Sequence, residues 1–370
     1  MKGFQEIVAT IQSLAEPAAL ATLVRVKGSS YRQPGARMVF GPAGIRTGVI
    51  SAGCLETDIL ARAGEVLDGG GAHLAPYDLG SDLDLVWGTG MGCQGRADVL
   101  LERVTPGPVP EWMDRCSAIL GRRGTGALAT VFAARGETGG LRPGDHFLAD
   151  EAGPGLRPGP GPFAGLLESA LDKARSGGVL ATPTLEAGTG ELDLLVEPIL
   201  PPYALWIFGA GEHSRPIVRL AKELGWFVGI VDHRPALATP ERFPQADRII
   251  VGHPPGSLRD LPLDRRSAAL VVSHIYEKDR QALEALLPAP VAYLGLQGNR
   301  ARSRRLVKDL EESGLPLTGD RAAKLRFPAG LDIGAETPET IALSMLAEVQ
   351  AALSGHPGGP LRDRGGRIHN

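Results

Sequence analysis

Two cysteines in the N-terminal part of the chain stand where a thiol could touch a ligand. Cys54 follows Gly53 in GVISAGCLE, and Cys93 lies in GTGMGCQG, where glycines let other groups approach the bare backbone closely. The residues after Cys54 predict a helix, and the dipole at a helix N-terminus lowers the pKa of a thiol. Thiolates suit soft metals and their sulfur ligands, so Gly53, Cys54, Cys93 and nearby Glu56 are candidates for contact with a cofactor of that kind. The alternative is that both cysteines are small buried apolar side chains.

An arginine and a third cysteine complete the candidates of the N-terminal half. Arg37 in PGARM is a candidate anion contact, because a guanidinium matches the geometry of phosphate and carboxylate groups. The alternative is an arginine solvated on the surface of a strand. Cys116 lies in EWMDRCSAIL, a pattern typical of a helix, and we predict a structural role for it.

The stretch FGAGEHSRP places glycines where an apolar strand passes into a helix. Gly209 permits the tight turn, and Gly211 lets backbone N–H groups approach a phosphate at the helix N-terminus, beside His213. Asp232 stands 21 residues after Gly211, at the end of the next expected strand, where an acid would hold a ribose hydroxyl. This pattern predicts a nucleotide-type site, although Ser214 replaces the third glycine of the usual motif. The alternative is a glycine turn that only closes the sheet.

Further polar residues follow later strands of the same region. His274 comes directly after VVS, at the carboxyl edge where open α/β sheets bind ligands. One strand later, GLQGNR predicts a turn with Asn299 as helix cap and Arg300 as a phosphate contact. Arg234, close after Asp232, is either a contact for a 2′-phosphate or a solvated side chain. The histidines have no metal-ligand spacing and no nucleophile elbow occurs, so we predict neither a metal site nor catalytic residues.

Alternating strand and helix patterns must position these residues. The first 105 residues predict an α+β domain, and its expected elements are a helix over 1–14, a strand over 18–28, a hairpin over 36–51, a helix over 54–68 and a strand over 96–104.

A similar order recurs over residues 106–200. ALATLVRVKGSSYRQPG at 19–35 lines up with ALATVFAARGETGGLRPG at 127–144, and RADVLLERV at 96–104 lines up with ELDLLVEPI at 191–199. This favours a degenerate internal duplication, in which only the first copy keeps the cysteine motifs. The alternative is two αβ segments that share common residues by chance.

Beyond the proline-rich hinge EPILPPYA, at 197–204, strands and helices alternate strictly. YALWIFGAG is an almost continuous apolar run, as expected of a strand buried on both faces. The alternation predicts an α/β domain over 201–354 with a right-handed, doubly wound parallel sheet, followed by a flexible tail over 355–370.

Composition excludes several classes of protein. The net charge of -3 and the pI near 6.3 exclude a protein whose main partner is nucleic acid, because phosphate binding needs a clustered basic surface. The N-terminus lacks the apolar run of a signal peptide, and no spanning segment follows, so we expect a cytoplasmic protein without membrane attachment. Three cysteines in 370 residues form no disulfide framework, and we expect reduced thiols.

Several stretches together resemble the XdhC/CoxI family of xanthine dehydrogenase accessory proteins, namely GSSYRQPGARM, GVISAGCLE, WGTGMGCQGRADVLLE, LWIFGAGEHSRP, VVSHIYEKDRQAL and GLDIGAETPETIALSMLAEV. The resemblance covers about residues 5–105 and 195–350. It implies an N-terminal domain with the glycine–cysteine motif and a C-terminal Rossmann-type domain. The chain departs from the family at Tyr31 and Gln33, where prolines are common, and at Glu212, where glycine is usual.

The resemblance also implies a function. Such proteins bind the molybdenum cofactor, protect it while a terminal sulfur is installed, and help to insert it into molybdenum hydroxylases such as xanthine or carbon monoxide dehydrogenase. The implied partners are the hydroxylase apo-enzyme, a cysteine desulfurase and a second copy of the chain. The alternative is an NAD(P)-dependent oxidoreductase, suggested by the glycine turn and Asp232, although the chain shows no catalytic tyrosine–lysine pair. A cofactor chaperone without turnover is therefore the favoured interpretation.

Overall fold

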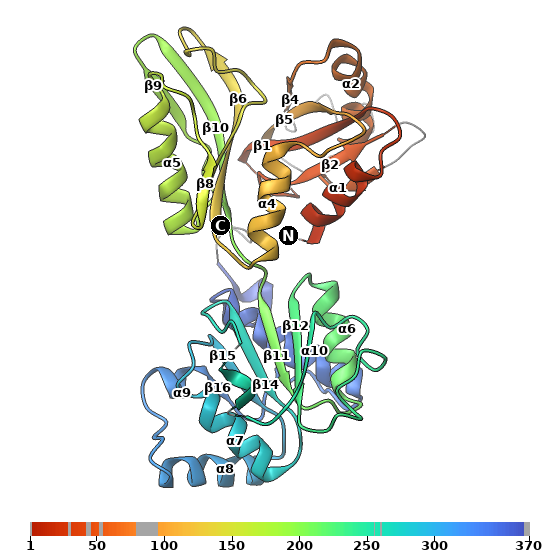
Figure 1. The fold of residues 1–370 in the computed structure, drawn as a ribbon, viewed down its shortest axis with the longest axis vertical. Coiled ribbons are helices and arrows are strands. Elements are labelled where there is room, and N and C mark those ends of the chain that lie inside the picture. The colour runs from red at the N-terminus through yellow and green to blue at the C-terminus, as the bar shows by residue number, and fades with distance from the viewer. Residues whose placement is uncertain are drawn as a thin grey trace. The chain divides into compact units, whose positions relative to one another are not determined.

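The chain divides into two units, Met1–Pro201 (unit 1) and Pro202–Asn370 (unit 2), and the boundary between them falls in the proline-rich segment of the sequence (Figure 1). The structure is a computed structural model and describes residues 2–28, 31–41, 46–51, 55–78, 95–254, 256–259 and 261–365. Each unit is considered by itself below.

The first half of unit 1 is an antiparallel sheet with the strand order β3-β2-β1-β5-β4. Its elements are α1 (Lys2–Gln12), β1 (Ala18–Gly28), β2 (Arg37–Phe40), β3 (Arg46–Gly48), α2 (Glu56–Gly69), β4 (His73–Asp78) and β5 (Gly95–Val104). Helix α2 covers one face of this sheet because Ile59, Ala63 and Val66 fall on one side of it and are buried. It ends at Gly70, whose left-handed backbone lets its N–H bond the carbonyl of Val66.

The second half of unit 1 repeats this arrangement. Its elements are α4 (Glu111–Gly121), β6 (Gly126–Arg135), β7 (His146–Asp150), β8 (Gly153–Leu156), α5 (Ala164–Gly177), β9 (Thr184–Ala187) and β10 (Gly190–Ile199). The strand order β8-β7-β6-β10-β9 is that of the first sheet with each strand replaced by its counterpart. Helix α5 likewise packs on its own sheet and ends at a left-handed glycine, Gly178. The shared order is what the duplication hypothesis expects.

The two halves of unit 1 share a hydrophobic core. One cluster joins α1 and α4 to both sheets and includes Ile11, Met113 and Leu128, all almost fully buried. A second cluster consists of Val24, Leu100, Phe132 and Leu195, two residues from each sheet. Burying each such side chain contributes about 1.5–3 kcal/mol, so the halves stabilise one another.

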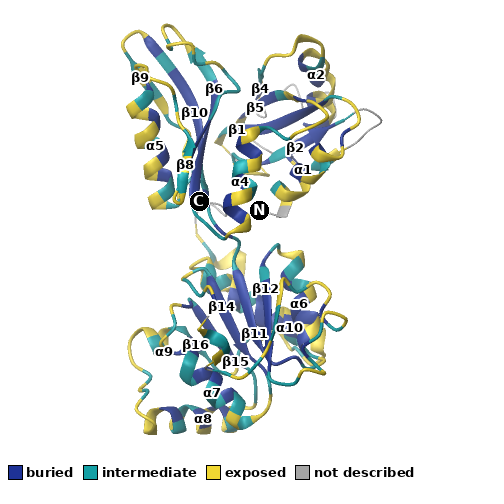
Figure 2. Cartoon of the chain, in the orientation of Figure 1, coloured by how far each residue is buried: buried dark blue, intermediate teal, exposed yellow. Residues whose placement is uncertain are grey.

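Unit 2 is an all-parallel sheet with helices on both faces, which confirms the predicted doubly wound fold. The central strands β11, β12 and β14, dark blue in Figure 2, are buried over almost all of their residues, whereas the edge strand β13 has no buried residue. The strands are β11 (Ala204–Phe208), β12 (Phe227–Asp232), β13 (Arg248–Val251), β14 (Ser267–Val271), β15 (Tyr293–Leu296) and β16 (Leu325–Arg326). The helices are α6 (Ser214–Glu223), α7 (Tyr276–Leu286), α8 (Arg300–Glu312), α9 (Asp320–Lys324) and α10 (Pro338–Leu353).

Two core clusters hold the layers of unit 2 together. Helices α6 and α10 pack on one face of the sheet, and α7 and α8 on the other. The predicted cap is confirmed, since Asn299 accepts from the N–H of Arg302 at the start of α8. Thr337 forms a capping box ahead of Pro338 at the start of α10.

The strand order β13-β12-β11-β14-β15-β16 reverses direction between β11 and β14. The loops that leave these two strands diverge, and ligands of open α/β sheets bind in the crevice this creates. His213 and His274 both lie in these loops, after β11 and β14 respectively.

Candidate functional site

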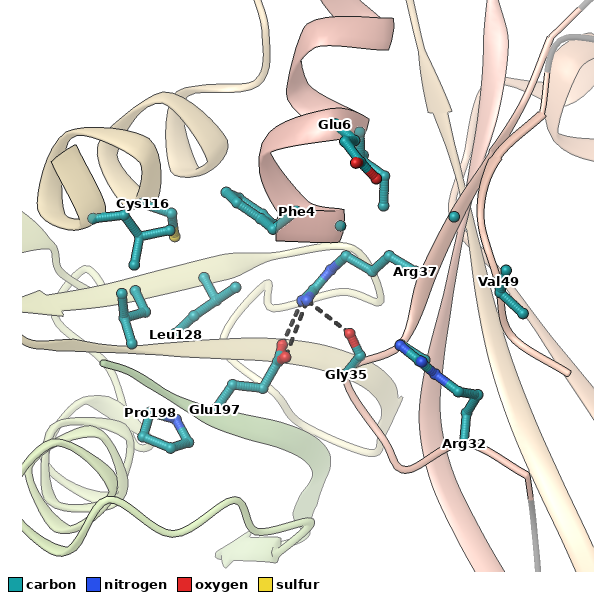
Figure 3. A pocket seen from close by; sticks show the side chains of 16 residues that line it. Phe4, Glu6, Arg32, Gly35, Arg37, Val49, Cys116, Leu128, Glu197 and Pro198 are labelled. Atoms are coloured by element: carbon teal, nitrogen blue, oxygen red, sulfur yellow. Dashed lines mark hydrogen bonds and ion pairs between the residues drawn. The ribbon is translucent and has the colours of Figure 1, made fainter. Parts of the chain in front are cut away.

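In unit 1, Arg37 forms a buried ion pair with a residue of the other half. Its Nη1 donates to Glu197 Oε1 at 3.0 Å and to the carbonyl of Gly35 at 3.1 Å, and its Nη2 bonds Glu197 Oε2 (Figure 3). Only 8% of the Arg37 side chain and 14% of the Glu197 side chain are exposed. Burial alone would lower the pKa of Arg37, but the Glu197 carboxylate outweighs it and the pKa is raised. Arg37 is therefore not a solvated strand arginine.

A cavity of about 430 Å³ adjoins this ion pair. Arg32 adds a second guanidinium beside Gly35, while Phe4 and Leu128 contribute apolar walls (Figure 3). Arg37 Nε is buried and has no hydrogen-bond partner within the described residues. The lining also includes Glu6 and Glu197, so its two arginines are balanced by two acidic side chains. A cavity of this size with apolar walls and a few polar groups fits an organic ligand.

A second pair mirrors the first across the two halves. In the sequence repeat, His146 is the counterpart of Arg37 and Glu102 the counterpart of Glu197. His146 Nε2 lies 2.7 Å from Glu102 Oε1, and its Nδ1 lies 3.1 Å from Thr130 Oγ1. Each half therefore supplies a glutamate to the strand of the other, which is the reciprocity of an isologous interface.

Trp112 of α4 lies between the two pairs. Its ring stacks on His146 with centroids 4.4 Å apart, and the Arg37 guanidinium carbon lies 5.4 Å from the same ring system. The cavity is lined by Arg37 and Glu197, whereas neither Trp112 nor His146 is among its lining residues. Trp112, Glu197 and His146 were not predicted as site residues, although the alignment of the two sequence copies contains the signal for both pairs.

Glu56 is hydrogen-bonded to Ser51, so it links residues that stand on either side of Gly53 and Cys54 in the sequence. Its carboxylate accepts from the N–H of Ser51 at 2.8 Å and from the Ser51 hydroxyl, which in turn accepts from the N–H of Leu55 at 3.1 Å. Burial raises the pKa of Glu56, but the Ser51 hydrogen bonds outweigh it and the net pKa is lowered. Glu56 therefore holds Ser51 and Leu55 together. The candidates Gly53, Cys54 and Cys93 lie outside the described residues.

Cys116 lines the cavity of unit 1 as a buried thiol. It is 3% exposed, and burial raises its pKa to about 12, partly opposed by Arg37. It is therefore a protonated, unreactive thiol at neutral pH, in keeping with the structural role predicted for it.

In unit 2 the glycine turn after β11 packs against its own chain. A Cβ on Gly209 would lie 2.7 Å from the backbone N of Ser273, so the close approach of the loop after β14 requires glycine. A Cβ on Gly211 would lie 2.6 Å from the His213 ring, whose Nε2 donates to the carbonyl of Val272 at 2.9 Å. The imidazole thus lies over the glycine where a phosphate was expected to approach.

Asp232 is likewise engaged within the chain. Its carboxylate accepts from the N–H of Ala210 at 2.7 Å and from the Arg234 guanidinium at 2.7 and 2.9 Å. Burial raises the pKa of Asp232, but these donors lower it to about 2. Arg234 is therefore an ion-pair partner and not a solvated side chain. The adjoining cavity of about 20 Å³ has room for one water at most in this conformation.

His274 is held in an unusual backbone conformation beside this turn. Its φ of 61° lies in the left-handed region, and its ring packs edge-on against His213 with centroids 4.7 Å apart. Partial desolvation and the neighbouring His213 lower the pKa of His274. Arg300 begins α8 as predicted but is exposed.

The described parts of the chain hold neither a cluster of metal ligands nor a helix that could span a membrane. The described residues contain no group of three or more His, Cys, Asp or Glu side chains placed to hold a metal ion. Among the same residues, no helix has both the length and the apolar character needed to cross a membrane.

Comparisons with known proteins find relatives along most of the chain. Two family models match: the XdhC and CoxI family over residues 12–78, and the XdhC Rossmann domain over residues 205–349. The chain is 32% identical over 351 residues to a probable xanthine dehydrogenase subunit of Bacillus subtilis, covering 94% of this chain and 97% of that protein.

More distant relatives extend these matches. The chain is 25% identical to the molybdenum cofactor insertion chaperone PaoD of Escherichia coli, covering 90% of this chain and 82% of that one. A crystal structure described as a xanthine dehydrogenase from Bacillus halodurans matches with a TM-score of 0.75 and 29% identity, covering 96% of each chain. The similarity thus runs through both units.

Proposed function

Because this chain belongs to the XdhC and CoxI family, we propose that it is a molybdenum cofactor chaperone without turnover of its own. It binds and protects the cofactor in the cytoplasm, assists its sulfuration, and delivers it to a hydroxylase of the xanthine or carbon monoxide dehydrogenase type. The main support for this proposal is the sequence similarity to the Bacillus subtilis protein over nearly the whole chain. The similarity to the insertion chaperone PaoD supports it further. The hydroxylase apo-enzyme, a cysteine desulfurase and a second copy of the chain are its proposed partners.

The residues of unit 1 suit the chemistry of such a cargo. A molybdopterin carries a phosphate, which guanidinium groups bind well, and a flat polar ring system, which fits a partly apolar cavity. It also carries a sulfur-ligated metal, which prefers a soft ligand such as a thiolate. Arg37 Nε is a buried donor without a partner among the described residues, and Arg32 adds a second cation on the same cavity. We assign these arginines to the phosphate and the thiols of Cys54 and Cys93 to the metal or its sulfur.

The test measures cofactor on protein purified from molybdenum-replete cells. Molybdenum is quantified by mass spectrometry and the pterin by the fluorescence of its oxidised form. We expect cofactor on the wild type, a severalfold loss in Cys54→Ala, and retention in the control Asp172→Asn, which changes an exposed side chain of α5 that does not line the cavity. A wild type free of cofactor, together with a hydroxylase that matures normally in cells lacking the chain, would refute the proposal.

The competing activity, hydride transfer with NAD(P), has less support. The groups that a dinucleotide would use, at Gly211 and Asp232, are already engaged by His213 and Arg234. Titration with NADH and NADPH separates the two functions, since micromolar binding with reduction of a carbonyl substrate would favour the oxidoreductase.

A further inference from the structure

The turn from β15 into α8 leaves buried polar atoms without partners. Gln297 Oε1, Arg302 Nη1 and Ser303 Oγ are all inaccessible and make no hydrogen bond within the described residues. Ser303 is 0% exposed. An unsatisfied buried polar group costs about 1–3 kcal/mol, so three in one turn call for an explanation, such as an ordered water or a bound ion.

Two of these atoms, Arg302 Nη1 and Ser303 Oγ, lie close to the backbone of a glycine. A Cβ on Gly298 would lie 3.3 Å from Arg302 Nη1 and 3.6 Å from Ser303 Oγ. Gly298 has a φ of 152°, a conformation that a side chain rarely adopts. We call Gly298, Arg302, Ser303 and the first turn of α8 the α8 cradle.

The glycine turn after β11 provides an internal comparison. Ser214 stands five residues after Gly209, and Ser303 stands five residues after Gly298. Both serines are fully buried in the first turn of a helix that follows a parallel strand. The Ser214 hydroxyl donates to the carbonyl of Gly209 at 2.7 Å, whereas that of Ser303 has no partner in the described chain. The hydroxyl of the first turn is therefore satisfied within that turn, whereas the hydroxyl of the second turn is available to bond a ligand.

The charges around the cradle favour an anion. Helix α8 begins with the run RARSRR, which places four arginines at the positive end of its dipole, where cations are unfavourable. Among them, Arg302 is neutralised by one contact, since its Nη2 donates to the buried Asp279 at 2.6 Å. The N–H of Arg302 donates to the Asn299 side chain, so the first-turn donors that remain are the N–H groups of Arg300 and Ala301, which no helical bond uses.

From these observations we propose that the α8 cradle binds the phosphate group of a small phosphomonoester. The Ser303 hydroxyl, Arg302 Nη1 and the first N–H groups of α8 donate to the phosphate oxygens. The Arg302 side chain shifts to let the anion reach Ser303, since Arg302 Nη1 and Ser303 Oγ both lie close to the position that a Cβ on Gly298 would take. The site lies within unit 2 and does not depend on the proposed role in cofactor delivery.

The test is a titration of the full-length chain with inorganic phosphate, followed by ³¹P NMR line broadening. We expect saturable binding that Ser303→Ala weakens by about tenfold or more, because a hydrogen bond to a charged group is lost. Arg302→Lys, which keeps a cation beside Asp279, should weaken binding as well. Ser214→Ala is the matched control and should change the dissociation constant less than about twofold, since the hydroxyl it removes already donates to the carbonyl of Gly209 within its own turn.

A second titration with 5′-AMP separates the two sources of a phosphate group. Binding of AMP at least as tight as that of phosphate, with the same loss in Ser303→Ala, assigns the cradle to a phosphomonoester. Binding of inorganic phosphate alone, lost in Ser303→Ala, keeps the cradle as an anion site but overturns its assignment to an ester. The proposal fails outright if the wild type shows no saturable binding, or if Ser214→Ala abolishes binding while Ser303→Ala does not. Melting curves show whether each variant is folded.

Discussion

The ion pair between Arg37 and Glu197 allows a quantitative test of how the two halves of unit 1 hold together. Glu197→Gln keeps the shape of the side chain but removes the counter-ion of a guanidinium that is only 8% exposed. Breaking a buried pair in this way costs about 3–5 kcal/mol, because the remaining charge stays desolvated. Unit 1 spans about 200 residues, for which 1 kcal/mol shifts the melting temperature by about 2–4 °C. We therefore expect a drop of at least about 6–12 °C.

Differential scanning calorimetry of the full chain measures this, with the transition of unit 2 as an internal reference. The matched control is Asp58→Asn, which breaks the exposed pair with Arg62 and should cost no more than about 0.5 kcal/mol. The double variant Arg37→Met with Glu197→Met should recover most of the lost stability, because two apolar groups leave no buried charge. The reasoning is wrong if Glu197→Gln melts like the control, or if the double variant melts as low as Glu197→Gln.

Three further predictions concern single groups. Asp232→Asn should destabilise unit 2 by about 2 kcal/mol at neutral pH, because the folded pKa of Asp232, about 2, lies below that of an unfolded aspartate. In urea unfolding, the difference in free energy between wild type and variant should vanish as the pH falls from about 4 towards 2, and a pH-independent difference would contradict this. Cys116, whose pKa is raised to about 12, should resist iodoacetamide in the native protein and react after denaturation, as peptide mapping would show; labelling of the native thiol would exclude the buried site. Glu56→Gln should lower the unfolding free energy of unit 1 by about 1–2 kcal/mol through weaker bonds to Ser51, measured by calorimetry, and an unchanged transition would mean that this contact is not made.

Local patterns made most of the fold predictable from the sequence. The apolar run of β11, the strict alternation beyond it and the capping residue Thr337 are short-range signals, and each predicted element is present. The recurrence of ALAT and of the closing strand led to the duplication hypothesis, which the matching strand orders of the two sheets support.

The site was less predictable because its contacts are tertiary. Arg37 was selected for its residue type, but its partner Glu197 is 160 residues away and belongs to the other copy. The position of the His213 ring over Gly211 follows from a bond to Val272, at the end of a strand that is not adjacent in sequence. Residue spacing shows which groups could bind a ligand, whereas packing decides which of them are already occupied.

The exchange of glutamates between the halves of unit 1 also limits how the chain can be shortened. The second half carries none of the glycine–cysteine motifs, so a fragment ending after β5 would look sufficient by sequence. Such a fragment would leave Arg37 without its carboxylate and would expose the apolar surface that Phe132 and Leu195 now cover. Any shortened version intended for biochemical work must therefore extend at least to Ile199, the last residue of β10.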